Sequence, residues 1–215
     1  MKILNLYACL GGNRYKWNEV KDDIEVTAVE LDPEAARLYQ ERFPNDKVIV
    51  ADAHQYLLDH YKEFDFIWSS PPCPSHSKIN ITQKTRDVWK PRYPSMMLYE
   101  EIIFLMHYFE GKYCLENVVP FYEPLIPAKK RGRHLYWTNF NLPNNLSNKE
   151  YGKNLSNMKI IELSKYHDYD FNKYNGEQSK IKMARNLVDY EAGKTIFETA
   201  LGIISKSNSK QTTLL

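Results

Sequence analysis

A cysteine follows an apolar stretch that is typical of a buried strand. The stretch covers residues 64–68, and Cys73 comes after two serines and the prolines Pro71 and Pro72. Proline fixes its own φ angle, so the thiol is expected at a defined place just past the strand. Ligands of open α/β sheets bind at the carboxyl ends of the strands. Cys73 is therefore predicted to be a nucleophile; the plainer alternative is a packing cysteine.

A carboxyl group stands in a similar position after the next predicted strand. Glu116 follows Tyr113, Cys114 and Leu115. If the two strands are neighbours, Cys73 and Glu116 share one pocket, whereas the alternative is a surface glutamate. A thiol and a carboxylic acid together suit addition to a pyrimidine, in which sulfur attacks C6 and the acid protonates N3. C5 then becomes nucleophilic enough to accept a methyl group.

A nucleoside site is predicted at the ends of the first three strands. Gly11 and Gly12 let the backbone approach a ligand, and Glu30 stands eighteen residues further on, where an acid often binds ribose hydroxyls. Asp52 ends the third strand and could accept from an adenine amino group. The dinucleotide fingerprint GxGxxG is absent, which favours an adenosine ligand without a pyrophosphate, such as S-adenosylmethionine. A Gly-Gly turn followed by an exposed acid also occurs in many α/β domains without such a ligand.

These groups must be positioned by alternating strands and helices. Strands are predicted at residues 2–7, 25–30, 48–50, 64–68, 113–115 and 133–140. Helices are predicted from Gly11-Gly12 onward and over 33–43, 54–61, 95–109 and 187–204. Repeated strand–helix units predict a mostly parallel, doubly wound sheet, with the strand at 133–140 as an added antiparallel element.

Composition sets the broader limits. The chain has 215 residues, a formal net charge of +2 and three cysteines, at positions 9, 73 and 114. So small a charge does not by itself indicate a nucleic-acid-binding protein. The cysteines form no CxxC pair, so neither a disulfide framework nor a metal site is predicted, and a cytoplasmic setting is expected. No apolar run approaches the roughly 20 residues of a membrane span.

The order of these motifs resembles the DNA cytosine-5 methyltransferases. The similarity rests on Tyr7–Gly12, Glu30-Leu31-Asp32, Asp52, Pro71–Ser77, Glu116-Asn117-Val118, Arg131-Gly132-Arg133 and Arg185–Val188. It covers roughly residues 2–140 and 183–203. Relatives that methylate amino groups carry an aromatic residue after Pro-Pro, so Cys73 indicates chemistry at carbon 5. The resemblance implies a class I S-adenosylmethionine-dependent methyltransferase fold, Rossmann-like, with a small loop-rich insert.

The resemblance also implies roles for individual residues. Cys73 would be the nucleophile, Glu116 would hold N3, and Arg133 would contact the cytosine O2. S-adenosylmethionine, which leaves as S-adenosylhomocysteine, would be bound by Tyr7, Ala8, Cys9, Leu10, Gly11, Gly12, Glu30, Leu31, Asp52, Ala53, Pro71 and Asn186. Double-stranded DNA with a flipped cytosine would be bound by Ser77, Lys78, Arg86, Asn117 and Arg131, partly from a mobile loop over residues 75–94.

The chain departs from the family pattern in three places. Cys9 stands where glycine is usual, and the glutamine that normally precedes Arg-x-Arg is replaced by lysine at 129–130. The region that recognises the target is short. Residues 1–140 and 183–204 are expected to form the catalytic domain, residues 141–182 a reduced recognition insert, and residues 205–215 a flexible tail. Target recognition would then be loose or supplied by a partner, and a monomer or weak dimer is expected.

Three functions are therefore weighed. The preferred one is a DNA cytosine-5 methyltransferase from a phage or restriction–modification setting. The second keeps the fold and methylates cytosine in RNA such as tRNA. The third is a non-catalytic nucleic-acid-binding module, for which the altered loop at Cys9 is the support.

Overall fold

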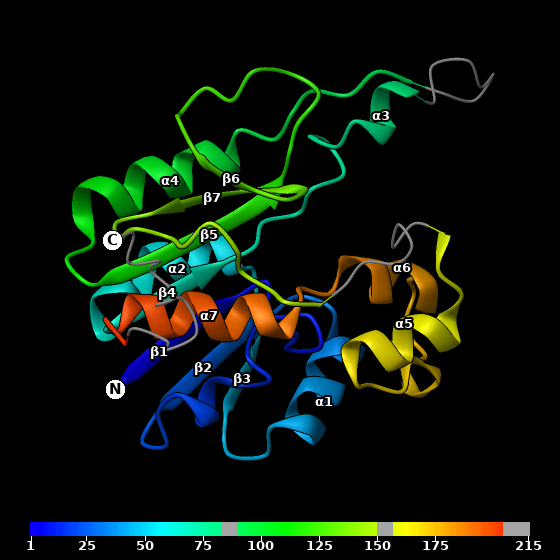
Figure 1. The fold of residues 1–215 in the computed structure, drawn as a ribbon, viewed down its shortest axis with the longest axis horizontal. Helices are drawn as coiled ribbons and strands as arrows, with labels where there is room; N and C mark the ends of the chain where they lie inside the picture. Colours follow the sequence, from blue (N-terminus) through cyan, green and yellow to red (C-terminus); the bar gives the residue numbers. More distant parts are fainter. Residues whose placement is uncertain (83–89, 150–156, 204–215) are drawn as a thin grey trace, which may run out of the picture.

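Seven strands form one mixed sheet in the computed structural model, which describes residues 1–82, 90–149 and 157–203. The strand order is β3-β2-β1-β4-β5-β7-β6. The strands are β1 (Lys2–Leu6), β2 (Glu25–Glu30), β3 (Lys47–Val50), β4 (Phe66–Ser69), β5 (Lys112–Val118), β6 (Lys129–Arg131) and β7 (His134–Thr138). β1 to β5 pair in parallel, while β7 runs antiparallel to both β5 and β6. The mostly parallel sheet and its added antiparallel element are thus confirmed (Figure 1).

Alternating side chains of the strands bury the two faces of the sheet. Leu4, Leu6 and Ile67 pack on one face with residues of α2 (Ala53–His60) and α4 (Met97–Tyr108). Ile3 and Phe66 point to the other face, which α7 (Tyr190–Ala200) covers. Successive strand residues point to opposite faces, so the continuous apolar runs of β1 and β4 match a sheet covered on both sides.

Two helices are capped by aspartates that follow strands β2 and β3. Asp32 caps α1 (Pro33–Arg42) by accepting hydrogen bonds from the backbone of Glu34 and Ala35. Asp52 caps α2 through the backbone N–H of Gln55. Carboxylates at this position satisfy N–H groups that have no partner within the helix. The predicted helices at 33–43, 54–61 and 95–109 are confirmed to within two residues at either end.

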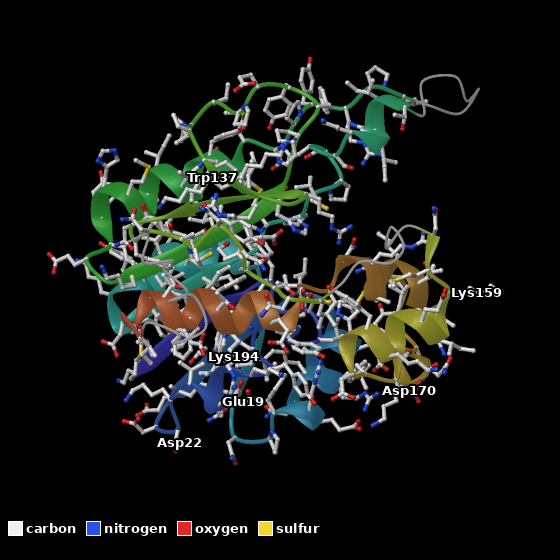
Figure 2. All side chains as sticks on the ribbon, in the orientation of Figure 1. Glu19, Asp22, Trp137, Lys159, Asp170 and Lys194 are labelled. Atoms are coloured by element: carbon white, nitrogen blue, oxygen red, sulfur yellow. The ribbon has the colours of Figure 1, made fainter. Side chains whose placement is uncertain are left out.

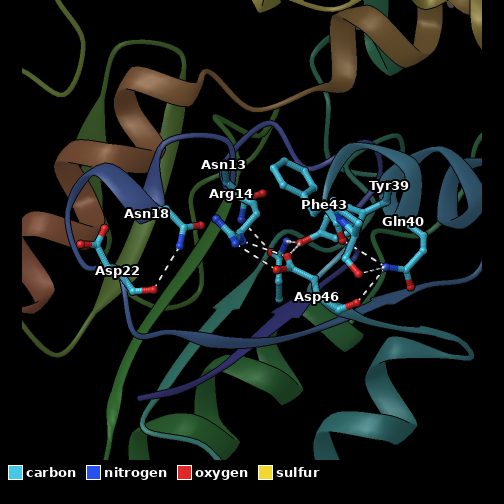
Figure 3. A network of polar contacts seen from close by, with 10 residues as sticks. Asn13, Arg14, Asn18, Asp22, Tyr39, Gln40, Phe43 and Asp46 are labelled. Carbon is cyan, nitrogen blue, oxygen red and sulfur yellow. Dashed lines mark hydrogen bonds and ion pairs between the residues drawn. The ribbon is translucent and has the colours of Figure 1, made fainter.

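The prediction of a helix from Gly11-Gly12 onward is wrong. The chain there forms turns and then the short 3₁₀ helix η1 (Trp17–Glu19), because its polar side chains are fixed by the body of the protein (Figure 3). Arg14 makes two 2.9 Å hydrogen bonds to buried Asp46, and Asn13 donates to Asn5 at 2.7 Å. These contacts fix the backbone at Asn13 and Arg14, and a regular helix in this segment would break them.

The C-terminal helix α7 covers the face of the sheet to which Ile3 and Phe66 point. Phe197 packs against Trp17 and Phe66 with ring centroids 5.3 and 5.5 Å apart. The Trp17 indole donates to the carbonyl of Gly193, and Lys194 pairs with Glu19 at 2.7 Å (Figure 2). The helical spacing predicted at 187–204 is therefore confirmed over its central part.

Residues 157–187 form more regular structure than the sequence indicated. They contain α5 (Ile160–His167), the 3₁₀ helix η4 (Phe171–Lys173) and α6 (Lys180–Asn186), which lie beside α1 in Figure 1. Leu163, Phe171 and Met183 pack with Leu38 of α1 and with Leu10 of the predicted cofactor loop. This part of the insert therefore joins the wall of the site, while the proposed domain boundaries stay a prediction.

Two predicted segments fall partly or wholly outside the described residues. The tail at 205–215 and Arg86 of the loop at 75–94 lie there. The described start of that loop forms the four-residue helix α3 (Ile79–Thr82), which projects from the body in Figure 1. Among the described helices, none has the length and apolar character needed to span a membrane.

Candidate functional site

The strand order changes direction between β1 and β4, and the predicted site residues gather at the carboxyl ends around that point. β1 leads onward to β2 on one side and β4 to β5 on the other, with Leu6 paired to Ser69. Such a switch point leaves a crevice where ligands of α/β sheets bind. Tyr7 follows β1, Glu30 ends β2, and the segment that leads to Cys73 follows β4.

The segment that carries Cys73 is held against β5 by Asn117. The Asn117 side chain is buried and donates to the carbonyl of Pro71 at 2.9 Å, while its own oxygen accepts from the backbone of Val118. The backbone N–H groups of His76 and Ser77 then close a turn onto the carbonyl of Cys73. Asn117, predicted to bind substrate, thus fixes the nucleophile's backbone; its contact with substrate stays a prediction.

Charged groups surround the Cys73 thiol. Burial raises the pKa of Cys73, and the neighbouring Glu116 carboxylate raises it further. Arg133 and Lys182 act in the opposite direction and lower this pKa. Glu116 and Arg133 are thus close enough to Cys73 to affect the pKa of its thiol, while their catalytic roles stay predictions. Lys182, at the start of α6, is a member of this group that the sequence analysis missed.

Glu116 has a histidine neighbour that was also missed. Nε2 of His134 lies 3.4 Å from Oε1 of Glu116. In the antiparallel pair Glu116 faces Tyr136, so His134 sits diagonally on the same face, within reach of long side chains. Burial lowers the pKa of His134, which favours the neutral imidazole. The only sequence signal was its place directly after Arg133, because the strand register could not be known.

The predicted cofactor loop has an unusual backbone. Tyr7 and Cys9 have φ angles of 54° and 48°, in the left-handed region that glycine favours. The backbone N–H of Cys9 donates to Oε2 of Glu30 at 2.8 Å, so the loop is tied to the end of β2. Burial raises the pKa of the Cys9 thiol to about 12, which keeps it protonated. The cysteine that replaces the family's usual glycine is accommodated with the loop still turned toward Glu30.

Gly12 lets the C-terminal motif approach this loop closely. A Cβ at Gly12 would lie 2.3 Å from the carbonyl oxygen of Val188 and 2.6 Å from the Leu187 side chain. The fold thus brings the segment after Asn186 against the first loop, from opposite ends of the chain. Asn186 itself is exposed, and Arg133 donates to the carbonyl of the preceding Arg185 at 3.5 Å.

The predicted cofactor acids at the ends of β2 and β3 are held by backbone hydrogen bonds, and their contact with a nucleoside stays a prediction. Both carboxylate oxygens of Glu30 accept backbone N–H bonds, from Cys9 and from Asp32, which fixes the carboxylate and leaves further lone pairs for ribose hydroxyls. Burial raises the pKa of Glu30. Asp52 has the same kind of support at the start of α2. Beside them Leu31 is exposed, whereas Ala8, Leu10, Ala53 and Pro71 are buried.

The remaining predicted residues lie around the rim. The Arg131 guanidinium donates to the carbonyls of Pro143, Leu142 and Lys130, so it anchors the segment after β7. Ser77 accepts from the backbone of Ile79 through its hydroxyl, and Lys78 is exposed. Their contacts with substrate stay predictions. Within the described ranges, no cluster of three or more His, Cys, Asp or Glu side chains is arranged to hold a metal ion.

A mostly parallel sheet in this strand order, with acids at the ends of β2 and β3, defines the class of Rossmann-like methyltransferases. The sequence profile of the C-5 cytosine-specific DNA methylases matches residues 1–123. The chain belongs to this family.

One solved methyltransferase structure shares the fold along most of the chain, and two others are similar over about half of it. The Entamoeba histolytica methyltransferase EhMeth aligns over 94% of this chain and 98% of its own, with a TM-score of 0.51 and 10% identity. A mutant of Spodoptera frugiperda DNMT2 is 29% identical over 54% of this chain, with a TM-score of 0.39. A TehB-like SAM-dependent methyltransferase from Corynebacterium glutamicum has 18% identity, a TM-score of 0.33, and covers 54% of each chain.

This chain spans 35% of the DNMT2 chain. Among curated proteins, none matches the sequence.

Proposed function

We propose that the protein is a DNA cytosine-5 methyltransferase that acts through a covalent bond between Cys73 and C6 of a flipped cytosine. The observation that supports this proposal is the place of Cys73 beside the switch point of the sheet, with Glu116 and Arg133 close enough to affect the pKa of its thiol. The family match supports chemistry at carbon 5. Double-stranded DNA as the substrate is part of the proposal.

The cofactor that fits this site is S-adenosylmethionine. Glu30 would bind the ribose, Asp52 the adenine amino group, and the loop at 7–12 the methionine part. The fixed Glu30 carboxylate and the close approach at Gly12 are the structural features that suit such a ligand. When bound, S-adenosylmethionine supplies an electrophilic methyl group.

The residues of the chain would divide the remaining work. The Cys73 thiolate forms a bond to C6, while Glu116 as a carboxylic acid gives its proton to N3 and leaves an enamine at C5. Once C5 is methylated, a base removes the C5 proton, the sulfur–C6 bond breaks to release the thiolate, and the N3 proton returns to Glu116. A protonated Glu116 no longer raises the pKa of Cys73, whereas Arg133 and Lys182 still lower it.

Trapping with 5-fluorocytosine tests the covalent step, because fluorine at C5 blocks the proton loss that releases the enzyme. The wild-type protein, incubated with S-adenosylmethionine and duplex DNA that contains 5-fluorocytosine, is expected to form an adduct stable in denaturing gels. Cys73→Ala should form none. Cys114→Ala is the matched control, because Cys114 is a fully buried thiol on β5 that a base cannot reach. Adduct formation by Cys73→Ala would refute the mechanism.

The substrate is tested separately with a radioactive methyl group. Transfer from tritiated S-adenosylmethionine to duplex DNA, with tRNA as a parallel arm, distinguishes DNA from RNA methylation. Incorporation into tRNA alone would overturn the assignment to DNA and keep the mechanism. Bisulfite sequencing of DNA from cells that express the protein then gives the sequence context of the methylated cytosines.

A further inference from the structure

A buried carboxylate lies beneath the candidate site. Glu101 on α4 has a side chain with 0% exposure and makes three short polar contacts. The hydroxyls of Tyr7 and Ser69 donate to Oε1 and Oε2 respectively, each at 2.6 Å. Nδ1 of His54 lies 3.1 Å from Oε1. None of these contacts is part of the chemistry proposed for Cys73.

Each contact comes from a segment that ends in the site. Tyr7 follows β1 and begins the predicted cofactor loop, and Ser69 is the last residue of β4, four positions before Cys73. His54 is the second residue of α2, directly after Asp52 and Ala53. Glu101 is therefore a single group that joins the loop for the cofactor to the strand that carries the nucleophile.

The backbone at Tyr7 makes its side-chain contact informative. A tyrosine with a φ of 54° lies in the left-handed region, which its Cβ disfavours. Burial and the Glu101 carboxylate raise the pKa of Tyr7, so its hydroxyl stays protonated and donates. The bond to Glu101 thus holds Tyr7 in a conformation that its backbone alone disfavours.

A buried carboxylate is also an expensive way to connect three elements. Apolar side chains of similar volume would fill the space without the cost of removing a charge from water. Here the cost is offset by two short hydroxyl donors and by His54, which Glu100 and Asp52 also face. Fixed polar groups of this kind define a single geometry more sharply than packing does.

We propose that Glu101 is a positioning residue, which sets the cofactor loop through Tyr7 and the nucleophile strand through Ser69. The proposal rests on the cofactor part of the proposed function. It assigns different consequences to the two contacts. Loss of the Tyr7 hydroxyl should weaken binding of the cofactor, whereas loss of the Ser69 hydroxyl should slow the step at Cys73.

The test uses Tyr7→Phe and Ser69→Ala, which remove one hydroxyl each and leave Glu101 in place. Binding of S-adenosylhomocysteine is measured by calorimetry, and methyl transfer by initial rates. Tyr7→Phe should bind S-adenosylhomocysteine about tenfold more weakly, the change that about 1.4 kcal/mol produces, with a similar rise in KM and little change in kcat. Ser69→Ala should lower kcat and leave the dissociation constant within about twofold of wild type.

Thr199→Val is the control, because its hydroxyl donates to the carbonyl of Thr195 at 2.6 Å within α7, away from Tyr7 and Ser69. It should bind S-adenosylhomocysteine as wild type does. Wild-type affinity in Tyr7→Phe, or equal loss of affinity in Tyr7→Phe and Ser69→Ala, would overturn the positioning role. If the wild-type protein itself does not bind S-adenosylhomocysteine, the proposed function fails at its first step, and the two failures are thus distinguishable.

Glu101→Gln provides a further check by calorimetry and thermal unfolding. The amide keeps the size of the side chain but can accept from only one of the two hydroxyls. A folded Glu101→Gln protein should show both defects, weaker binding and lower kcat. A folded variant with wild-type values for both would contradict the proposal, and if this variant does not fold, Tyr7→Phe and Ser69→Ala decide the question.

Discussion

Asn117 shows how one buried amide determines where the nucleophile stands. Its Nδ2 holds the carbonyl of Pro71, two residues before Cys73. We expect Asn117→Ala to lose about 1–3 kcal/mol of stability, because the mutation leaves a buried carbonyl without its donor. Trapping of 5-fluorocytosine DNA should slow as well, since the segment of Cys73 is released from β5. Urea unfolding and the rate of adduct formation measure the two effects.

Asn139→Ala is the control for that experiment. Asn139, the residue after β7, makes the same kind of bond, to the carbonyl of Gly111 at 2.8 Å. Gly111 directly precedes β5, and the bond lies at an exposed position. Its loss should cost less stability and leave trapping unchanged. Equal trapping by Asn117→Ala and wild type would show that Pro71 and Pro72 position Cys73 without help.

Gly12 provides a second prediction for a single residue. In Gly12→Ala the new methyl group would lie 2.3 Å from the carbonyl oxygen of Val188, so the segment after Asn186 must move away. We expect a loss of about 1–3 kcal/mol in stability, typical of an overpacked contact, together with weaker binding of S-adenosylhomocysteine. Urea unfolding measures the stability, and calorimetry measures the binding of S-adenosylhomocysteine. Unchanged values for both would mean that the C-terminal motif adapts freely.

The predicted site residues that lie at the carboxyl ends of the strands share a local signal. Glu30 ends β2, Glu116 lies near the end of β5 and Cys73 follows β4. The carboxyl ends of parallel strands meet at one edge of the sheet whatever the details of packing. His134, Lys182 and Glu101 carry no such signal. His134 depends on the register of β7 against β5, and Glu101 reaches the site only because α4 packs beneath it. Those facts belong to tertiary structure and could not be deduced from residue spacing.

At the scale of elements, the segment after β1 illustrates the limits of local patterns. A glycine pair after a strand favours a helix start, but the helix does not form, because Arg14 and Asn13 bond to Asp46 and Asn5 instead. Conversely, α5 forms from a stretch with weak periodicity, because Leu163 packs in one apolar cluster with Leu38 of α1 and with Leu10. In both cases contacts distant in sequence outweigh local preference.

Helix α5 also leads to a prediction about pH. Burial lowers the pKa of His167 to about 3, from an ordinary value of 6.5. Between these two values the unfolded chain binds a proton that the folded protein refuses, so stability is complete above pH 6.5 and is lost as the pH falls toward 3. His167 should contribute a slope of at most about 1.4 kcal/mol per pH unit within this window.

His167→Leu removes the titrating group and keeps an apolar side chain of similar size. We expect its free energy of unfolding to fall less steeply than that of wild type between pH 6 and pH 4, a window of about two units below the ordinary histidine pKa. Urea unfolding at several pH values measures the slope. Parallel curves for the two proteins would show that His167 is protonated without loss of structure.

At the scale of the whole molecule, the part of the chain that matches the family is not a structural unit by itself. Residues 1–123 lack α7 and β7, which cover Trp17, Phe66 and Cys114 in the complete fold. We expect a fragment of residues 1–123 to show no cooperative unfolding transition and to bind the dye ANS, because large aromatic side chains would be exposed. A cooperative transition in calorimetry, with near-ultraviolet circular dichroism similar to that of the full chain, would contradict this expectation.

Ligand binding offers a second prediction at this scale. A ligand that binds only the folded state stabilises it by about 2.7 kcal/mol at a hundred times its dissociation constant. S-adenosylhomocysteine should therefore raise the melting temperature in a saturable manner. Glu30→Gln should abolish most of this shift, because Glu30 anchors the loop through Cys9 and faces the proposed ribose site. An equal shift in Glu30→Gln would place the ligand elsewhere.

The covering of the first strands by the last helix has a consequence for biosynthesis. β1 lies in the middle of the sheet and is made first, but its neighbour β4 follows some sixty residues later, and α7 comes near the end of the described chain. While the ribosome is still at work, Trp17 and Phe66 have no Phe197 to pack against. The nascent chain therefore exposes these aromatic side chains until α7 has been made, and the fold around the candidate site can close only then.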